Sequence, residues 1–119
     1  MIVDTFLYEL AKKINGESSE SPDYVAFSED VITPDATDTS IPGILDGDAA
    51  SGSRTLGVVT FNAIRSGAVA SSSGDYINTL GLTKTSGSGT LFAEALVPSI
   101  LHTTSYDLEV DWDITVSRA

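Results

Sequence analysis

The chain has 119 residues, a formal net charge of −11 from 17 acidic and 6 basic side chains, one histidine and no cysteine. This length fits a single domain, residues 1–119, that buries one core without disulfides, and the missing cysteine excludes a disulfide scaffold and a thiolate metal site. Six cations argue against a nucleic-acid partner, and the absence of a long apolar run or a basic leader argues against a membrane partner and a cleaved signal.

The acidic residues are unevenly placed. Residues 1–53 hold eleven acids and two bases, residues 106–119 hold four acids and one base, and the middle of the chain is nearly neutral. Such asymmetry indicates an acidic face for a basic partner, a solvated surface that keeps the protein soluble, or adaptation to a salt-rich habitat. Composition alone leaves these three interpretations open.

Residues 1–16 are predicted to form an N-terminal helical segment, with the helix over residues 4–14. Asp4 is positioned to cap its start, and Gly16 to end it in the left-handed conformation. Apolar side chains recur at helical spacing at Leu7, Leu10, Ala11 and Ile14. We expect this segment to be a docking element whose removal impairs assembly more than folding. Its candidate interface residues are Phe6, Leu7 and Leu10.

A short apolar strand is predicted at residues 24–27, followed by a long acidic loop over residues 28–53. The loop contains two prolines, three glycines and no base, and it has little hydrophobic periodicity. A loop of this length either packs on the body of the domain or binds a partner. Within it, Asp46 and Asp48 resemble a fragment of a calcium loop and are weak candidates for a metal site, with a simple turn as the alternative.

Residues 54–119 are predicted to form the β-strand body. A strand over residues 54–64 is apolar on both faces, which is typical of a strand inside a sheet or at an interface. Two further strands, at residues 76–85 and 90–97, are joined as a hairpin through Ser86-Gly87-Ser88-Gly89, and Pro98 is expected to end the second one.

The last strand shows the clearest pattern in the chain. From residue 106 to residue 117, apolar and polar side chains alternate without an error, so one face is predicted to join the core and the other to face solvent or a partner. Trp112 has the core-facing parity. Four carboxylates share the opposite face and are candidate interface residues: Asp107, Glu109, Asp111 and Asp113.

This order of elements predicts a mainly β fold. Runs of strands after one helix, without βαβ alternation, favour an antiparallel, jelly-roll-like β-sandwich with a short N-terminal helix. No catalytic set accompanies it. His102 has no positioned nucleophile in the sequence, and an uninterrupted row of acids on one strand more often faces water than a cleft. We therefore expect no enzymatic activity and no cofactor.

The order of short motifs also resembles that of small structural proteins of tailed phages and their archaeal relatives, of the tail-collar or tail-fibre-like kind. The motifs, in chain order, are Tyr24-Val25-Ala26-Phe27, the Pro/Thr/Asp stretch 33–41, Arg54 before a long strand, Ile77-Asn78-Thr79-Leu80-Gly81-Leu82, Gly89-Thr90-Leu91-Phe92-Ala93 and a closing strand with Trp112. The resemblance implies a homo-oligomeric virion component that contacts other virion structural proteins. A tail, baseplate or fibre position is expected, with a head decoration or turret protein and a carbohydrate- or cell-surface-binding module as alternatives.

Overall fold

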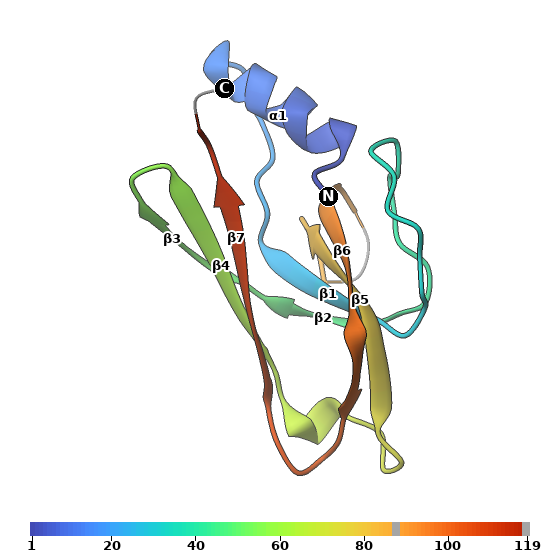
Figure 1. Cartoon of the computed structure of the whole chain (residues 1–119). Coiled ribbons are helices and arrows are strands. Elements are labelled where there is room, and N and C mark those ends of the chain that lie inside the picture. The colour runs from blue at the N-terminus through green and yellow to red at the C-terminus, as the bar shows by residue number, and fades with distance from the viewer. Residues whose placement is uncertain (87–88, 118–119) are drawn as a thin grey trace.

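The computed structural model describes residues 1–86 and 89–117, which form two antiparallel sheets and one α-helix (Figure 1). The predicted mainly β sandwich with a short N-terminal helix is therefore confirmed. The described residues form seven strands, one fewer than the eight of a jelly roll, so the jelly-roll topology stays a prediction. Gly87 and Ser88 of the predicted hairpin turn lie outside the described residues.

The strands divide between a four-stranded and a three-stranded sheet. The first has the order β2-β1-β5-β6, with β1 at Tyr24–Ser28, β2 at Ile44–Ala49, β5 at Asp75–Thr83 and β6 at Leu91–His102. The second has the order β3-β4-β7, with β3 at Ser51–Thr55, β4 at Val58–Arg65 and β7 at Leu108–Thr115. A 3₁₀ turn, η1, spans Gly67–Val69.

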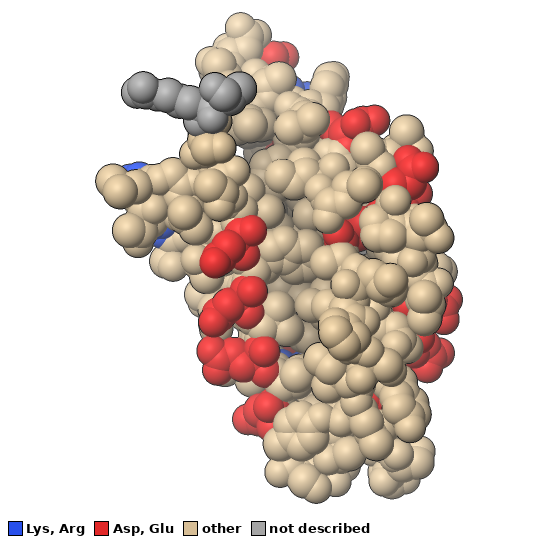
Figure 2. All heavy atoms as spheres, in the orientation of Figure 1, with Lys and Arg blue, Asp and Glu red and all other residues tan. Residues whose placement is uncertain are grey.

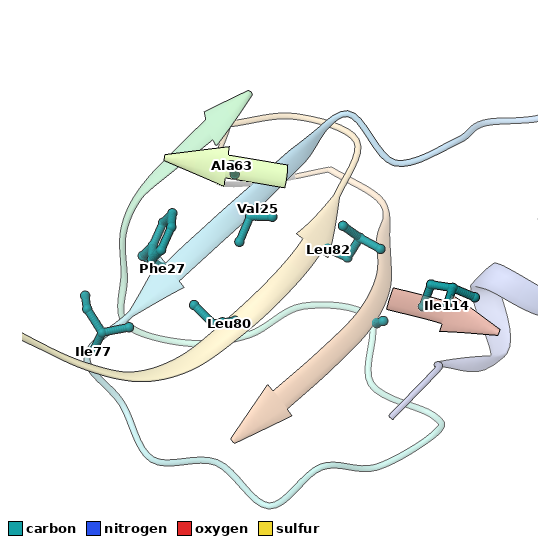
Figure 3. Packing of buried hydrophobic residues seen from close by; sticks show 8 residues of the cluster. Val25, Phe27, Ala63, Ile77, Leu80, Leu82 and Ile114 are labelled. Carbon is teal, nitrogen blue, oxygen red and sulfur yellow. The ribbon is translucent and has the colours of Figure 1, made fainter. Parts of the chain in front are cut away.

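The main core lies between the two sheets. Apolar side chains of both sheets meet there (Figure 3), because alternate residues of each strand point to the same face. Its buried members are Val25, Phe27, Ala63, Ile77, Leu80, Leu82, Ala93 and Ile114. Trp112 packs against this cluster, as the alternation in the last strand predicts.

The prediction of one long acidic loop over residues 28–53, separate from a strand body at 54–119, is wrong. Residues 44–49 pair with β1 as β2, and residues 51–55 pair with β4 as β3. Hydrogen bonds to the neighbouring strands determine the strand conformation of these residues, because their hydrophobic periodicity is weak. The chain crosses from one sheet to the other at Ala50, whose N–H donates to the carbonyl of Asp23 over 2.8 Å.

The remaining loop, residues 29–43, covers the outer face of the four-stranded sheet. Ile41 and Ile32 pack there against a second apolar cluster that includes Val3 and Leu91. The loop backbone is held by side chains of β5: Thr79 Oγ1 donates to the carbonyl of Asp30 over 2.7 Å, and the Asn78 amide donates to that of Glu29 over 2.8 Å. The segment is a third layer packed on the sandwich.

The predicted strand at residues 54–64 is also corrected, because the chain turns within it. Thr55 pairs with Val58, so Leu56 and Gly57 form the tip of the β3–β4 hairpin. Beyond the tip, β4 lies between β3 and β7, which agrees with the predicted strand inside a sheet.

Pro98 does not end its strand, contrary to prediction. β6 continues to His102, and its register against β5 shifts between the pairs Thr79–Leu96 and Ile77–Ile100. Since β6 is an edge strand, and the register shift leaves Pro98 outside the paired residues, the missing N–H of the proline costs no ladder hydrogen bond.

The N-terminal helix α1 spans Asp4–Ile14 as predicted, and Gly16 adopts a φ of 76°, the left-handed conformation expected after the helix. The expected cap is wrong: Val3 occupies the N-cap without a side-chain hydrogen bond, and Asp4 is already helical. No helix in the described ranges is long and apolar enough to cross a membrane.

Candidate functional site

Helix α1 lies at one end of the elongated molecule, which we call the apical end (Figure 1). The apolar side chains that recur at helical spacing on this helix face outward: Leu7, Leu10 and Ile14 are all exposed, Ile14 at 81 %. The candidate interface residues Leu7 and Leu10 are thus accessible to a partner. Phe6 is the exception, because its ring packs edge-on against Phe92 with 5.6 Å between ring centroids.

The inward side of α1 is built around a carboxylate, Glu9. Its Oε2 accepts the backbone N–H of Glu20 over 2.8 Å, and its Oε1 lies 3.2 Å from Lys12 Nζ. These donors, the backbone hydrogen bond first, hold the pKa of Glu9 below its usual value. The segment that returns from the helix thus satisfies the buried acid, and the leucines are left on the outside.

Residues before the helix are part of the fold. Val3 is fully buried, its N–H donates to the carbonyl of Phe92, and Ile2 forms a β-bridge with Ala93. We therefore revise the expectation that removing residues 1–16 would impair assembly more than folding, since this truncation would open the second apolar cluster. Point substitutions on the exposed face of α1 are the appropriate test.

Between α1 and the three-stranded sheet lies a groove of about 420 Å³, which we call the apical groove. Its lining is mostly apolar and comes from the N-terminus, the helix, β4 and the end of β7. The apolar lining residues include Ile2, Leu7, Leu10, Val59 and Val116. The groove and the exposed helix face form one continuous apolar surface.

Three of the four carboxylates predicted on one face of the last strand do share its outer face, and we call Glu109, Asp111 and Asp113 the acidic stripe. Acidic side chains form a row over β7 (Figure 2). Their partners on β4 are neutral: Asn62 donates to Glu109 and Asp111 over 2.9 and 2.8 Å, and Thr60 donates to Asp113 over 2.6 Å. Within the described part of the chain no salt bridge neutralises the stripe.

Asp107, the fourth predicted carboxylate, has a different position. It precedes β7, and its Oδ1 accepts the N–H of Gly67 over 2.8 Å at the start of η1. Gly67 itself is closely approached by the carbonyl of Tyr106, where a Cβ would come within 2.7 Å. Asp107 is therefore a local structural residue rather than a member of the acidic stripe.

The sequence interpretation missed a buried charge cluster around Arg65. This side chain is 1 % exposed, its Nε lies 2.9 Å from Asp46 Oδ1, and its Nη2 lies 3.0 Å from Asp75 Oδ2. Desolvation is the largest single effect on the pKa of Arg65 and lowers it, but the hydrogen bonds and charges of Asp46 and Asp75 together outweigh it and raise the pKa. The sequence does contain a sign that Arg65 is buried. It follows Val59, Phe61 and Ala63 at alternate positions, so it lies on the same face of β4 as these apolar side chains.

His102 belongs to the same cluster. Its Nδ1 lies 2.7 Å from Arg65 Nη1, and its Nε2 lies 2.8 Å from the carbonyl oxygen of Tyr106. No serine hydroxyl contacts the ring in the described structure. The arrangement suits a positioned structural histidine and offers no nucleophile–base pair of the kind that acyl transfer needs.

Asp46 and Asp48 do not form the calcium-loop fragment suggested by their spacing. Both oxygens of Asp46 accept from Arg65 Nε, at 2.9 and 3.1 Å. Burial, and then the charge of Asp46, raises the pKa of Asp48. Across residues 1–86 and 89–117 no group of three or more potential ligand residues is gathered, so neither aspartate is supported as a metal ligand.

Glu94 is a second buried acid that the sequence did not reveal. It lies under the 29–43 loop, where its Oε1 accepts the N–H of Asp35 over 2.8 Å. Burial first, and then a hydrogen bond with the Asp38 carboxyl, raises its pKa. The N-terminal ammonium donates to the backbone carbonyl of Glu94 over 2.6 Å, so this residue joins the loop, the sheet and the chain start.

Comparison with known proteins adds no relative. The chain matches no protein-family model, and searches of curated proteins and of solved structures likewise found no match.

Proposed function

We propose that this protein is a non-enzymatic structural component of a tailed virus particle that acts by self-assembly and by docking to other virion proteins. The observation that carries the proposal is the apical end, where Leu7, Leu10 and Ile14 face outward beside an apolar groove. Contiguous exposed apolar surface on a small protein is typical of an interaction site. The resemblance in motif order supplies the virion context.

The charged groups inside the fold support a structural rather than a catalytic role. Arg65 and His102 use their polar atoms on Asp46, Asp75 and the backbone of Tyr106. These contacts join β4 to β2, β5 and β6, so the cluster ties the two sheets together. Holding the two sheets together is enough to explain why these charged side chains are buried.

Among virion positions, we favour the tail, baseplate or fibre, because the proteins that the motif order resembles are of the tail-collar or tail-fibre-like kind. A head decoration or turret protein would use the same apical surface. A carbohydrate-binding module is the other alternative: Trp112 packs against the core, which leaves Tyr8, Tyr76 and Tyr106 as the exposed rings that could stack on a sugar.

The test is to raise an antibody against the purified protein and to apply quantitative mass spectrometry and immunogold labelling to purified particles of the virus that encodes it. The proposal expects a fixed copy number per particle and labelling at one location. Particles that contain none of the protein would overturn it. A particle from which the protein is removed by deletion serves as the control for antibody specificity.

A further inference from the structure

The tip of the β3–β4 hairpin presents a leucine in an unusual conformation. Leu56 has a φ of 52° and is 86 % exposed. A positive φ is uncommon for residues other than glycine and is strained when a bulky side chain adopts it. Neither packing nor backbone geometry within the monomer accounts for a leucine here, and the hairpin projects from the body of the molecule (Figure 1).

This projecting leucine lies beside the apical groove. Gly57, the other tip residue, accepts the N–H of Val116 over 2.7 Å, and Val116 lines the groove. The same end of the molecule therefore carries an apolar projection and an apolar recess. The projection does not fill the recess of its own chain, since Leu56 is exposed.

Two unpaired charges accompany these features. Arg54 Nη1 donates to the carbonyl of Leu56 over 3.1 Å, and no carboxylate pairs with Arg54 in the part of the chain that is described. Asp113 belongs to the acidic stripe on the outer face of β7. It lies two residues before Thr115, which lines the groove. This places Asp113 about 7 Å along the strand from the groove.

We propose that two copies of this chain associate through their apical ends, each inserting Leu56 into the apical groove of the other and pairing Arg54 with the partner copy's acidic stripe at Asp113. Because the projection and the recess are on the same end, a two-fold axis would make each contact reciprocal, so that both copies use the same surface. The inference rests on the proposed structural role and specifies how self-assembly begins.

Charge favours a second copy meeting at this end. At a net charge of −11, two copies repel through most of their surfaces. Lys13 and Arg54, which make no salt bridge within residues 1–86 and 89–117, both lie at the apical end. Approach through this end brings Arg54 of each copy toward the acidic stripe of the other.

The first experiment compares the wild type with Leu56→Gly by sedimentation velocity over a range of concentrations. We expect a wild-type dimer and a dissociation constant at least ~10-fold weaker for the variant, as for loss of a central contact residue. Glycine suits the positive φ, so the variant should fold at least as well as the wild type. A monomeric wild type, an unaffected variant, or a series of larger oligomers would overturn the two-fold pair.

A charge exchange tests the pairing itself. Arg54→Asp and Asp113→Arg should each weaken the dimer, and the double variant should restore the wild-type dissociation constant. Glu109→Arg combined with Arg54→Asp is the matched control, because Glu109 lies four residues along β7 and about 13 Å away. Rescue by the control pair, or no rescue by Asp113→Arg, would contradict the proposed contact.

These outcomes are separate from those of the virion test. A monomer in solution that is nevertheless present at fixed copy number in particles would overturn the apical dimer and leave the structural role intact. A dimer with the expected charge rescue but absent from particles would overturn the virion role and leave the dimer.

Discussion

Arg65 holds His102 in one tautomer. Arg65 Nη1 lies 2.7 Å from His102 Nδ1, and because a guanidinium only donates hydrogen bonds, Nδ1 must accept. The ring proton is therefore on Nε2, which donates to the carbonyl of Tyr106 over 2.8 Å. The chain of contacts runs from β4 in one sheet to β6 in the other and on to the loop that starts β7.

Replacing Arg65 with methionine should strongly destabilise the fold. The substitution removes a buried cation and leaves Asp46, Asp75 and His102 without their shared donor. Breaking a buried ion pair in this way costs about 3–5 kcal/mol. Urea unfolding followed by circular dichroism measures the loss.

Arg54→Met is the matched control for Arg65→Met, because it removes the same charge from an exposed side chain. The free energy of unfolding of the monomer should change by no more than about 0.5 kcal/mol. Equal losses for the two variants would show that the buried cluster adds nothing beyond net charge.

Elements with strong periodicity could be predicted from the sequence, and elements defined by long-range pairing could not. The alternation from residue 106 onward and the helical spacing of Leu7, Leu10 and Ile14 indicate β7 and α1 directly. β2 and β3 carry no such pattern, since β2 reads Ile-Leu-Asp-Gly-Asp-Ala and β3 reads Ser-Gly-Ser-Arg-Thr. Their strand conformation comes from hydrogen bonds to β1 and β4.

The candidate surface shows a similar division. The sequence indicates which residues of α1 are apolar, and the usual rule places that face inward. Here the rule fails because the return segment donates the Glu20 N–H to Glu9, a contact between residues eleven apart that no local pattern contains. Arg65 was overlooked for a related reason, since its partners come from three other strands.

Stability should fall as the pH rises through the titration of Glu94. Its pKa is raised in the folded state by burial and by Asp38, above the ordinary value of 4.5. The folded state thus binds the proton more tightly than the unfolded state, and its advantage is lost as the pH rises from about 4.5 through the raised pKa.

Glu94→Gln should abolish that part of the pH dependence, because an amide keeps an acceptor for the Asp35 N–H and does not ionise. The measurement is the free energy of unfolding of both proteins at a series of pH values, with the difference plotted. Asp48, whose pKa is also raised, contributes equally to both curves. A flat difference would show that Glu94 does not titrate as its burial implies.

Two glycines should differ in their tolerance of alanine. A Cβ on Gly47 would collide with the backbone carbonyl of Ser86, whereas a Cβ on Gly81 would meet the flexible Ile41 Cδ1 at 2.8 Å. Overpacking costs about 1–3 kcal/mol, and backbone yields less readily than a side-chain tip. We expect Gly47→Ala to lower the unfolding free energy more than Gly81→Ala. The opposite order in thermal or urea unfolding would contradict the placement of the 84–86 segment.

Asp107 and Asp111 provide a matched pair that separates a structural carboxylate from the acidic stripe. Asp107→Ala removes the acceptor for the Gly67 N–H and should lower the unfolding free energy by about 1 kcal/mol. Asp111→Ala loses a hydrogen bond to Asn62 on an exposed face but also relieves repulsion from Glu109 and Asp113, so the free energy of unfolding should change little.

The measurement is the free energy of unfolding of each variant at low and at high salt. Asp111→Ala should change how this free energy depends on salt, because the like charges around that position interact through solvent and are screened. Equal destabilisation by the two substitutions would mean that the stripe, like Asp107, serves the fold rather than a partner.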